Sequence, residues 1–140
     1  MNLYAESSAV LAWLFGEPGS ADCAHLLAEA TMVVTSDLTL IECDRTMIRA
    51  EATNQLAAAA AAERRAVLAR AAAHWRVLRL DGEVVERARR AFPSEPIRTL
   101  DAIHLAAALV GRAAVGDLAL LSLDERVREN GRALGFEMRP

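Results

Sequence analysis

Lysine is absent from the 140-residue sequence, and all 16 basic residues are arginine. A Walker-A nucleotide-binding loop, a Schiff-base site and a Ser-Lys dyad each need a lysine, so the sequence argues against these activities. The net charge of −3 argues against non-specific coating of nucleic acid as the main activity. The arginine bias itself is typical of GC-rich coding, which also favours the 30 alanines.

Cysteines and long apolar runs are also scarce. Cys23 and Cys43 are too few for a disulfide framework, and the first residues carry no charged region followed by an apolar stretch. The longest apolar run, 56–62, is too short to span a bilayer. We therefore expect a cytoplasmic protein with two reduced, buried thiols and no membrane partner.

Hydrophobic residues nevertheless make up 54% of the chain, so larger apolar side chains remain numerous once alanine is set aside. A chain of this length buries roughly 70% of its unfolded surface, and this composition suffices for one core. Charged residues make up 25%, which argues against intrinsic disorder. The sequence therefore predicts one domain, residues 1–140.

Short apolar runs alternate with longer helical stretches along the chain. Strands are predicted over 2–5, 32–35, 77–80, 118–123 and 136–138. Helices are predicted over 7–15, 20–30, from a Ser36-Asp37 cap onward, and over 56–75, 83–92, 99–115 (capped by Thr99) and 124–134. This alternation predicts a three-layer α/β/α fold around a central, mainly parallel sheet of about five strands. Right-handed crossovers place the C-terminal ends of the strands along one edge, where ligands bind.

Four acidic residues lie at the ends of predicted strands or near the starts of predicted helices: Glu6, Glu42, Asp101 and Asp124. Each has an ordinary explanation when taken alone. Acids complement the positive end of a helix dipole by about 0.3–1 kcal/mol, and Glu42 is spaced to pair with Arg45 or Arg49. If the sheet forms as predicted, however, all four face one crevice.

Several carboxylates in one crevice repel each other. Two of them about 5 Å apart, at an effective dielectric of about 20, repel by roughly 3 kcal/mol, so a cation or proton uptake has to compensate. Mg²⁺ and Mn²⁺ prefer such oxygen-rich sites and there activate water for phosphodiester hydrolysis. The hydroxyls of Ser8 and Ser122 are placed to orient the carboxylates or metal-bound waters.

The chain resembles the PIN-domain ribonucleases, and specifically the VapC-type toxins of bacterial toxin–antitoxin pairs. The most specific segment is Leu-Asp-Ala-x-His-Leu-Ala at 100–106, a recurrent signature of that family. The segments that carry the resemblance are 4–10, 36–42, 98–106, 121–126 and the closing 134–136. The resemblance covers nearly the whole chain and implies a PIN-like α/β fold.

The resemblance also implies that the four acids form the family's metal-binding quartet. Glu6, Asp101 and Asp124 would bind Mg²⁺ or Mn²⁺, and Glu42 would complete the site through a metal-bound water or as the water-orienting base. The family usually begins with aspartate. The extra methylene of Glu6 therefore either preserves coordination or distorts the octahedral geometry that Mg²⁺ demands. The family's hydroxyl positions correspond to Ser8 and Ser122.

Further polar residues lie on the same predicted helices as the acids. His104 follows Asp101 by three residues and is either a ligand or base, or a structural histidine, which its apolar neighbours favour. Arg45 and Arg49 share a helical face with Glu42 and are the best candidates for contact with RNA phosphates. The other arginine clusters are explained equally well by pairing with nearby glutamates.

The predicted helix 8–15 is apolar almost all round, so one face goes to the sheet and the rest needs a cover. A second copy of the chain or an antitoxin segment would provide it, and the resemblance implies both a homodimer and a VapB-like antitoxin.

We therefore expect a Mg²⁺- or Mn²⁺-dependent endoribonuclease toxin in which a metal-activated water attacks RNA. Two alternatives stay open. One is a catalytically degenerate PIN module that binds an antitoxin without cleaving, with Glu6 as the lesion. The other is a metal-dependent nuclease or phosphatase that acts on another phosphoester.

Overall fold

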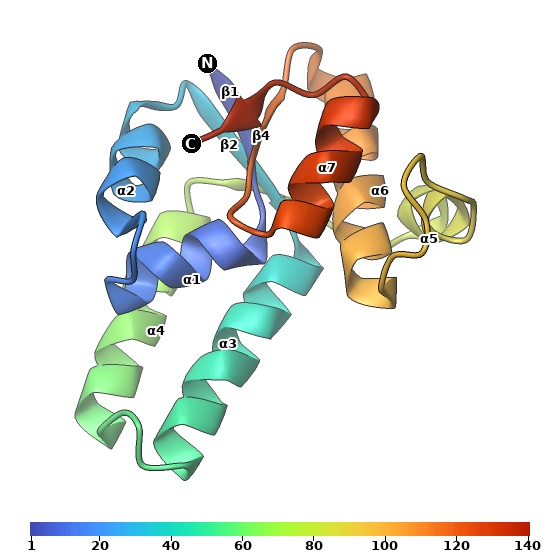
Figure 1. Cartoon of the computed structure of the whole chain (residues 1–140). Helices are drawn as coiled ribbons and strands as arrows, with labels where there is room; N and C mark the ends of the chain where they lie inside the picture. Colours follow the sequence, from blue (N-terminus) through green and yellow to red (C-terminus); the bar gives the residue numbers. More distant parts are fainter.

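The computed structural model describes residues 1–140 and contains one five-stranded parallel sheet in the order β3-β2-β1-β4-β5 (Figure 1). The expected α/β/α architecture is confirmed. The strands are β1 (Asn2–Ala5), β2 (Met32–Ser36), β3 (Arg76–Leu78), β4 (Ala119–Leu121) and β5 (Met138–Arg139). The helices are α1 (Ser7–Phe15), α2 (Ser20–Glu29), α3 (Asp37–Ala52), α4 (Ala58–Ala72), α5 (Gly82–Ala88), α6 (Thr99–Val115) and α7 (Glu125–Ala133).

Successive residues of the central strand β1 point to opposite faces of the sheet. Tyr4 packs in one apolar cluster with residues of α5, α6 and α7. Leu3 and Ala5 pack on the other face, in clusters built from α1, α2, α3 and α4. All three side chains are fully buried. Helices therefore cover both faces, as a parallel sheet requires.

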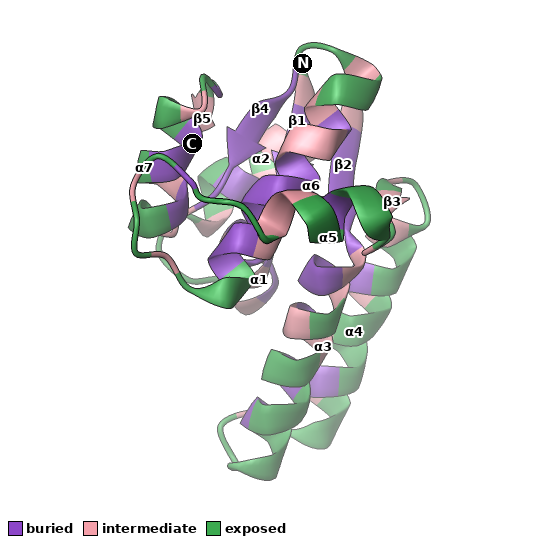
Figure 2. Cartoon of the chain, turned by 90° about the vertical axis from the view of Figure 1, so that its right-hand side faces the viewer, coloured by how far each residue is buried: buried purple, intermediate pink, exposed green.

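Helices α3 and α4 lie side by side and extend beyond the sheet, and their far ends are mostly exposed (Figures 1 and 2). Helix α4 is shorter at both ends than the predicted 56–75. Trp75 lies beyond its end and packs against Trp13 of α1, with 6.3 Å between ring centroids. Because α2, α3 and α4 surround α1, its apolar character is explained within the chain and no longer argues for a second molecule.

Other boundaries also differ from the prediction. The helix predicted to end at residue 92 ends at Ala88, since Phe92 precedes a proline and such a position disfavours helix. Residues 89–98 thus form a loop that leads into α6. Thr99 is the first helical residue rather than the cap, which is Arg98, and neither Arg98 nor Ser36 caps its helix through its side chain. The strands predicted over 77–80, 118–123 and 136–138 are shorter or shifted.

Cys23 and Cys43 are free thiols, both fully buried on the side of the sheet that carries α1 and α3. This matches the expected absence of a disulfide framework. None of the helices combines the length and the apolar character needed to cross a membrane.

Candidate active site

The four predicted acids all lie near the C-terminal ends of β1, β2 and β4 or at the starts of helices. Glu6 links β1 to α1, and Asp124 links β4 to α7, each at the N-cap position of its helix. Glu42 lies in the second turn of α3, and Asp101 in the first turn of α6. Figure 1 shows these helices starting at the same end of the sheet. The parallel strand order therefore brings residues from distant parts of the sequence to one edge.

Glu6 is 3% exposed, and hydroxyl groups surround its carboxylate. The Ser7 hydroxyl donates to Oε1 over 2.6 Å, and the Ser122 hydroxyl donates to Oε2 over 2.8 Å. The Ser8 hydroxyl and backbone amide also donate to Oε2. Ser8 Oγ in turn accepts the amides of Leu123 and Asp124. The buried charge of Glu6 is thus satisfied by hydrogen bonds.

His104 is 2% exposed and connects Glu42 with Glu6. Its Nε2 contacts Glu42 Oε1 and lies 3.5 Å from Glu6 Oε1 and 3.2 Å from Ser7 Oγ. Because two carboxylates face Nε2, we assign the ring proton to this nitrogen. Nδ1 is buried with no partner. The imidazole therefore acts toward the site through one nitrogen only.

The environment of Glu42 changes its ionisation. Burial alone would raise the pKa of Glu42, but the hydrogen bond and charge of His104, with smaller contributions from Ser7 and Arg98, outweigh burial and lower that pKa. Glu42 does not form the ion pair with Arg45 that its spacing suggested, because it turns toward α6 and His104 instead.

Asp101 and Asp124 share a different partner, Arg98. Arg98 Nε lies 3.1 Å from Asp101 Oδ2, and its Nη2 lies 3.3 Å from Asp124 Oδ2. Asp124 Oδ1 accepts the backbone amides of Arg126 and Val127 and so caps α7. The two aspartates are therefore linked through one guanidinium group.

Hydrogen bonds and ion pairs join the four acids in one continuous network. His104 and Ser7 join Glu42 to Glu6, the Ser8 hydroxyl joins Glu6 to the backbone of Asp124, and Arg98 joins Asp124 to Asp101. Carboxylate oxygens are the donors that hard divalent ions prefer. In this arrangement, however, no three His, Cys, Asp or Glu side chains converge closely enough to hold a metal ion. The donor set fits Mg²⁺ or Mn²⁺ in chemistry, and hydroxyl, imidazole and guanidinium groups contact the same carboxylate oxygens.

The structure places the remaining predicted residues at different distances from this network. Ser8 and Ser122 both touch Glu6. Arg45 and Arg49 are exposed on α3 and form no ion pair with the acids; Arg49 lines a groove of about 420 Å³ between α1 and α3, which Ser8 also lines. The sequence favoured a structural role for His104, and its burial agrees, but its ring nitrogen lies among the carboxylates. Ser7 and Arg98 were not predicted.

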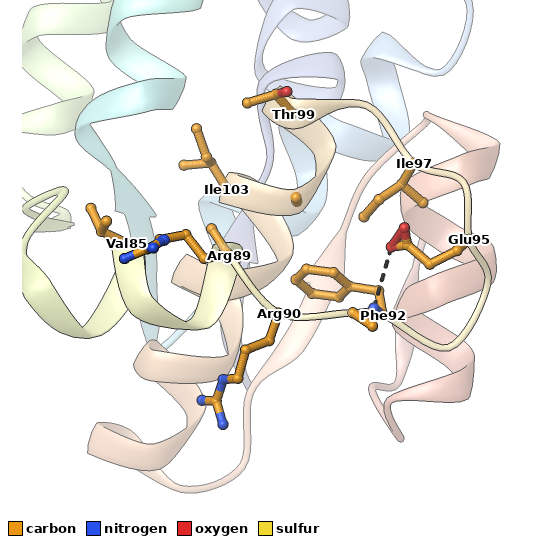
Figure 3. Close-up of a pocket in the computed structure, with 11 residues that line it drawn as sticks. Val85, Arg89, Arg90, Phe92, Glu95, Ile97, Thr99 and Ile103 are labelled. Atoms are coloured by element: carbon orange, nitrogen blue, oxygen red, sulfur yellow. Dashed lines mark hydrogen bonds between the residues drawn. The ribbon is translucent and has the colours of Figure 1, made fainter.

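A separate hollow of about 450 Å³ lies between α5, the 89–98 loop and the first turns of α6 (Figure 3). Its lining is mostly apolar and includes Phe92, Ile97 and Ile103, whereas none of the four acids lines it. Glu95 turns back to accept the amide of Phe92 over 3.3 Å, which holds the loop in a compact form (Figure 3). This hollow is distinct from the acidic site.

Comparison with known proteins identifies the family of the chain. The profile of the PIN domain matches residues 3–133. The chain belongs to the PIN-domain family. The chain is 35% identical over 134 residues to Ribonuclease VapC46 of Mycobacterium tuberculosis, with 96% of this chain and 93% of that protein covered. The family expected from the sequence motifs is thereby confirmed.

Solved structures of a toxin and of toxin–antitoxin complexes share the fold. VapC20 of Mycobacterium tuberculosis, described as a sarcin-ricin-loop-cleaving toxin, aligns with a TM-score of 0.65 at 20% identity, covering 99% of both chains. VapBC2 of Rickettsia felis, bound to a DNA fragment from its promoter, aligns with a TM-score of 0.66 at 8% identity. The alignment covers 99% of this chain and 98% of that chain. A toxin–antitoxin complex of Klebsiella pneumoniae aligns with a TM-score of 0.62 at 16% identity. The alignment covers 96% of this chain and 93% of that chain. At these identities the likeness concerns the fold.

Proposed function

We propose that this PIN-domain protein is a divalent-metal-dependent endoribonuclease toxin that hydrolyses RNA phosphodiester bonds. The observation that carries the proposal is the network that links Glu6, Glu42, Asp101 and Asp124 at one edge of the sheet. The 35% identity of the chain to Ribonuclease VapC46 supports the same proposal.

Carboxylates supply the proposed ligands for Mg²⁺ or Mn²⁺. Glu6, Asp101 and Asp124 would bind the ion directly, and Glu42 would act through a water molecule. When bound, the ion supplies an acidified water and neutralises charge on the phosphodiester. His104 donates to Glu42 and keeps that carboxylate ionised and in one orientation, as a water-orienting group requires.

Water is the proposed nucleophile, because the nearby hydroxyls are already engaged. The hydroxyls of Ser7, Ser8 and Ser122 all donate to Glu6. Their role is to fix the orientation of that carboxylate rather than to attack phosphorus. Arg45 and Arg49 are proposed to contact RNA phosphates from the exposed side of α3, since both are solvent-accessible and Arg49 lines the groove that reaches Ser8.

A small VapB-like antitoxin and a second copy of the chain are the proposed protein partners. Support comes from the toxin–antitoxin complexes among the structures that share the fold. Several large apolar side chains are also exposed and available for such contacts. They are Met1, Ile41, Ile48, Val85 and Leu100.

An RNA cleavage assay tests the function. Purified protein is incubated with single-stranded RNA, structured RNA, DNA and a phosphomonoester, with Mg²⁺ or Mn²⁺ and with EDTA. We expect cleavage of RNA only, and only with the added ion. Cleavage that persists in EDTA contradicts the metal dependence, and preferential hydrolysis of DNA or of the phosphomonoester contradicts the substrate class.

One observation favours a second candidate, a PIN module that binds an antitoxin without cleaving. Both oxygens of Glu6 are occupied by hydroxyl and amide donors, and no three ligands converge on a metal position. The Glu6→Asp variant separates the candidates. A working enzyme cleaves RNA before the change, whereas a degenerate module gains cleavage only after it.

A further inference from the structure

The Arg98 guanidinium contacts three of the four carboxylate oxygens of Asp101 and Asp124. Its Nε and Nη2 lie 3.1 and 3.5 Å from the two oxygens of Asp101, and Nη2 also lies 3.3 Å from Asp124 Oδ2. The remaining oxygen, Asp124 Oδ1, accepts two amides of α7. All four carboxylate oxygens therefore already have protein partners, and the planar guanidinium supplies three of these contacts.

The backbone that carries Arg98 is fixed to the same helix that Asp124 caps. Asn130 of α7 is 1% exposed, and its side chain accepts the amide of Ser94 over 2.9 Å and donates to the Ser94 carbonyl over 3.1 Å. Glu95 closes the loop further through the amide of Phe92 (Figure 3). The loop that leads to Arg98 is therefore anchored to α7 by a buried side chain.

The guanidinium group is far more exposed to solvent than the Asp101 carboxylate that it neutralises. The side chain of Arg98 is 60% exposed, whereas that of Asp101 is 7% exposed and fixed in the first turn of α6. An exposed guanidinium is held weakly in an ion pair, because water solvates its charge well after separation. The positive charge is thus exchangeable, while the carboxylates stay in place.

We propose that Arg98 is a built-in counter-cation of the acidic site, which a divalent ion has to displace from Asp101 and Asp124. Arg98 keeps the two aspartates together when no ion is bound and lowers the affinity of the site for divalent ions. The role accounts for the two aspartates alone, since serine hydroxyls and His104 hold Glu6 and Glu42. It rests on the proposed function only in assuming that these acids receive the ion.

Calorimetric titration of the full-length protein with Mn²⁺ tests this role. Arg98→Gln removes the charge but keeps a long polar side chain, and we expect it to bind Mn²⁺ about three- to tenfold more tightly, since each exposed ion pair accounts for a factor of about one and a half to five. Arg98→Lys keeps the charge and should stay within about twofold of the wild type. The matched control is Arg126→Gln, because Arg126 is exposed two residues from Asp124 and its side chain contacts neither aspartate.

Thermal unfolding gives a second measurement that does not depend on catalysis. Without metal, Arg98→Gln should melt below the wild type because the aspartates repel, and Mn²⁺ should raise its Tm more than that of the wild type. The proposal is overturned if Arg98→Gln binds Mn²⁺ no more tightly than the wild type, if neither protein binds it, or if Arg126→Gln tightens binding equally. If the wild type cleaves RNA but Arg98→Gln binds Mn²⁺ no more tightly than the wild type, only the proposed role of Arg98 is refuted. If Arg98→Gln binds Mn²⁺ more tightly but the wild type does not cleave RNA, only the proposed nuclease function is refuted.

Discussion

The two halves of the acidic site hold their negative charges in different ways. Glu6 and Glu42 are held by serine hydroxyls and by the buried imidazole of His104, which come from α1, from the residue after β4 and from α6. Asp101 and Asp124 are held by an exposed arginine from a loop. Hydrogen bonds from buried groups give a carboxylate one fixed orientation, whereas an exposed counter-charge leaves its place to another cation. On the proposal above, the aspartates are the part of the site from which a bound ion displaces a protein cation.

The largest expected effect comes from removing a charge in the aspartate half. Asp101→Asn should lower RNA cleavage by about 100- to 1,000-fold, as the loss of one electrostatic group at a reacting centre typically does. The unfolding free energy should change little, since the amide has the same shape and no longer repels Asp124. A cleavage assay and a urea melt measure both quantities. Asp117→Asn is the control, because Asp117 is exposed and lies just before β4, at the other end of that strand. Equal cleavage by Asp101→Asn and the wild type would remove Asp101 from the machinery.

A change in the hydrogen-bonded half should act on stability. His104→Phe fills the space but leaves Glu42 and Glu6 without their imidazole donor, so we expect the unfolding free energy to fall by about 1–3 kcal/mol in urea titrations. His104→Gln should recover part of the loss, because its terminal amide places a donor near the position of Nε2. A His104→Phe protein as stable as the wild type would show that the imidazole contacts contribute nothing.

Lowering the pH should reduce the contribution of Glu42 to the stability of the folded protein. The folded pKa of Glu42 lies below its ordinary value of 4.5, mainly because His104 outweighs the opposing effect of burial. A lowered folded pKa stabilises the protein fully above the unfolded pKa, and this stabilisation is lost as the pH falls through the folded value. The difference in unfolding free energy between the wild type and Glu42→Gln should therefore be constant above about pH 5 and shrink below pH 4.5. A difference that stays constant throughout this range would contradict the direction of the shift.

The smallest expected effect lies outside both halves. Arg49→Ala should weaken RNA binding a few-fold without changing Mn²⁺ affinity, and it should reduce the slope of log affinity against log salt by about 0.7, the value for one phosphate contact on a single strand. Arg70→Ala, on the exposed side of α4, is the matched control. If both variants bind RNA equally well, the groove beside Arg49 does not carry the substrate.

Sequence alone predicts the parts of this site that depend on local structure. Glu6 follows β1 directly and Asp124 comes shortly after β4, and each caps the next helix. The strand pattern therefore placed both at the same sheet edge. Arg98 could not be predicted in the same way. Its position depends on the path of the 89–98 loop, which hydrogen bonds between Ser94 and Asn130 determine. Such a contact between residues 36 positions apart leaves no periodic signal in the sequence.

His104 illustrates an intermediate case. Its spacing from Asp101 places both residues on one face of α6, and this much is visible in the sequence. The apolar residues around it predict burial, which the structure bears out at 2% exposure. Whether the ring nitrogen meets a carboxylate depends on how α6 is rotated toward β1 and α3, and a helical pattern does not specify that rotation. Burial and contact with charged groups are therefore not alternatives at such a position.

Burial of the two cysteines has a practical consequence. Burial raises the pKa of the Cys23 and Cys43 thiols, and the negative charge of Glu42 raises that of Cys43 further, so both stay protonated and unreactive in the folded protein. A maleimide or iodoacetamide pulse therefore modifies these side chains only in molecules that have opened. Cys43 lies one position from Glu42 and packs with residues of α1 and α4. Its rate of alkylation would therefore report the opening of this part of the core without any introduced label.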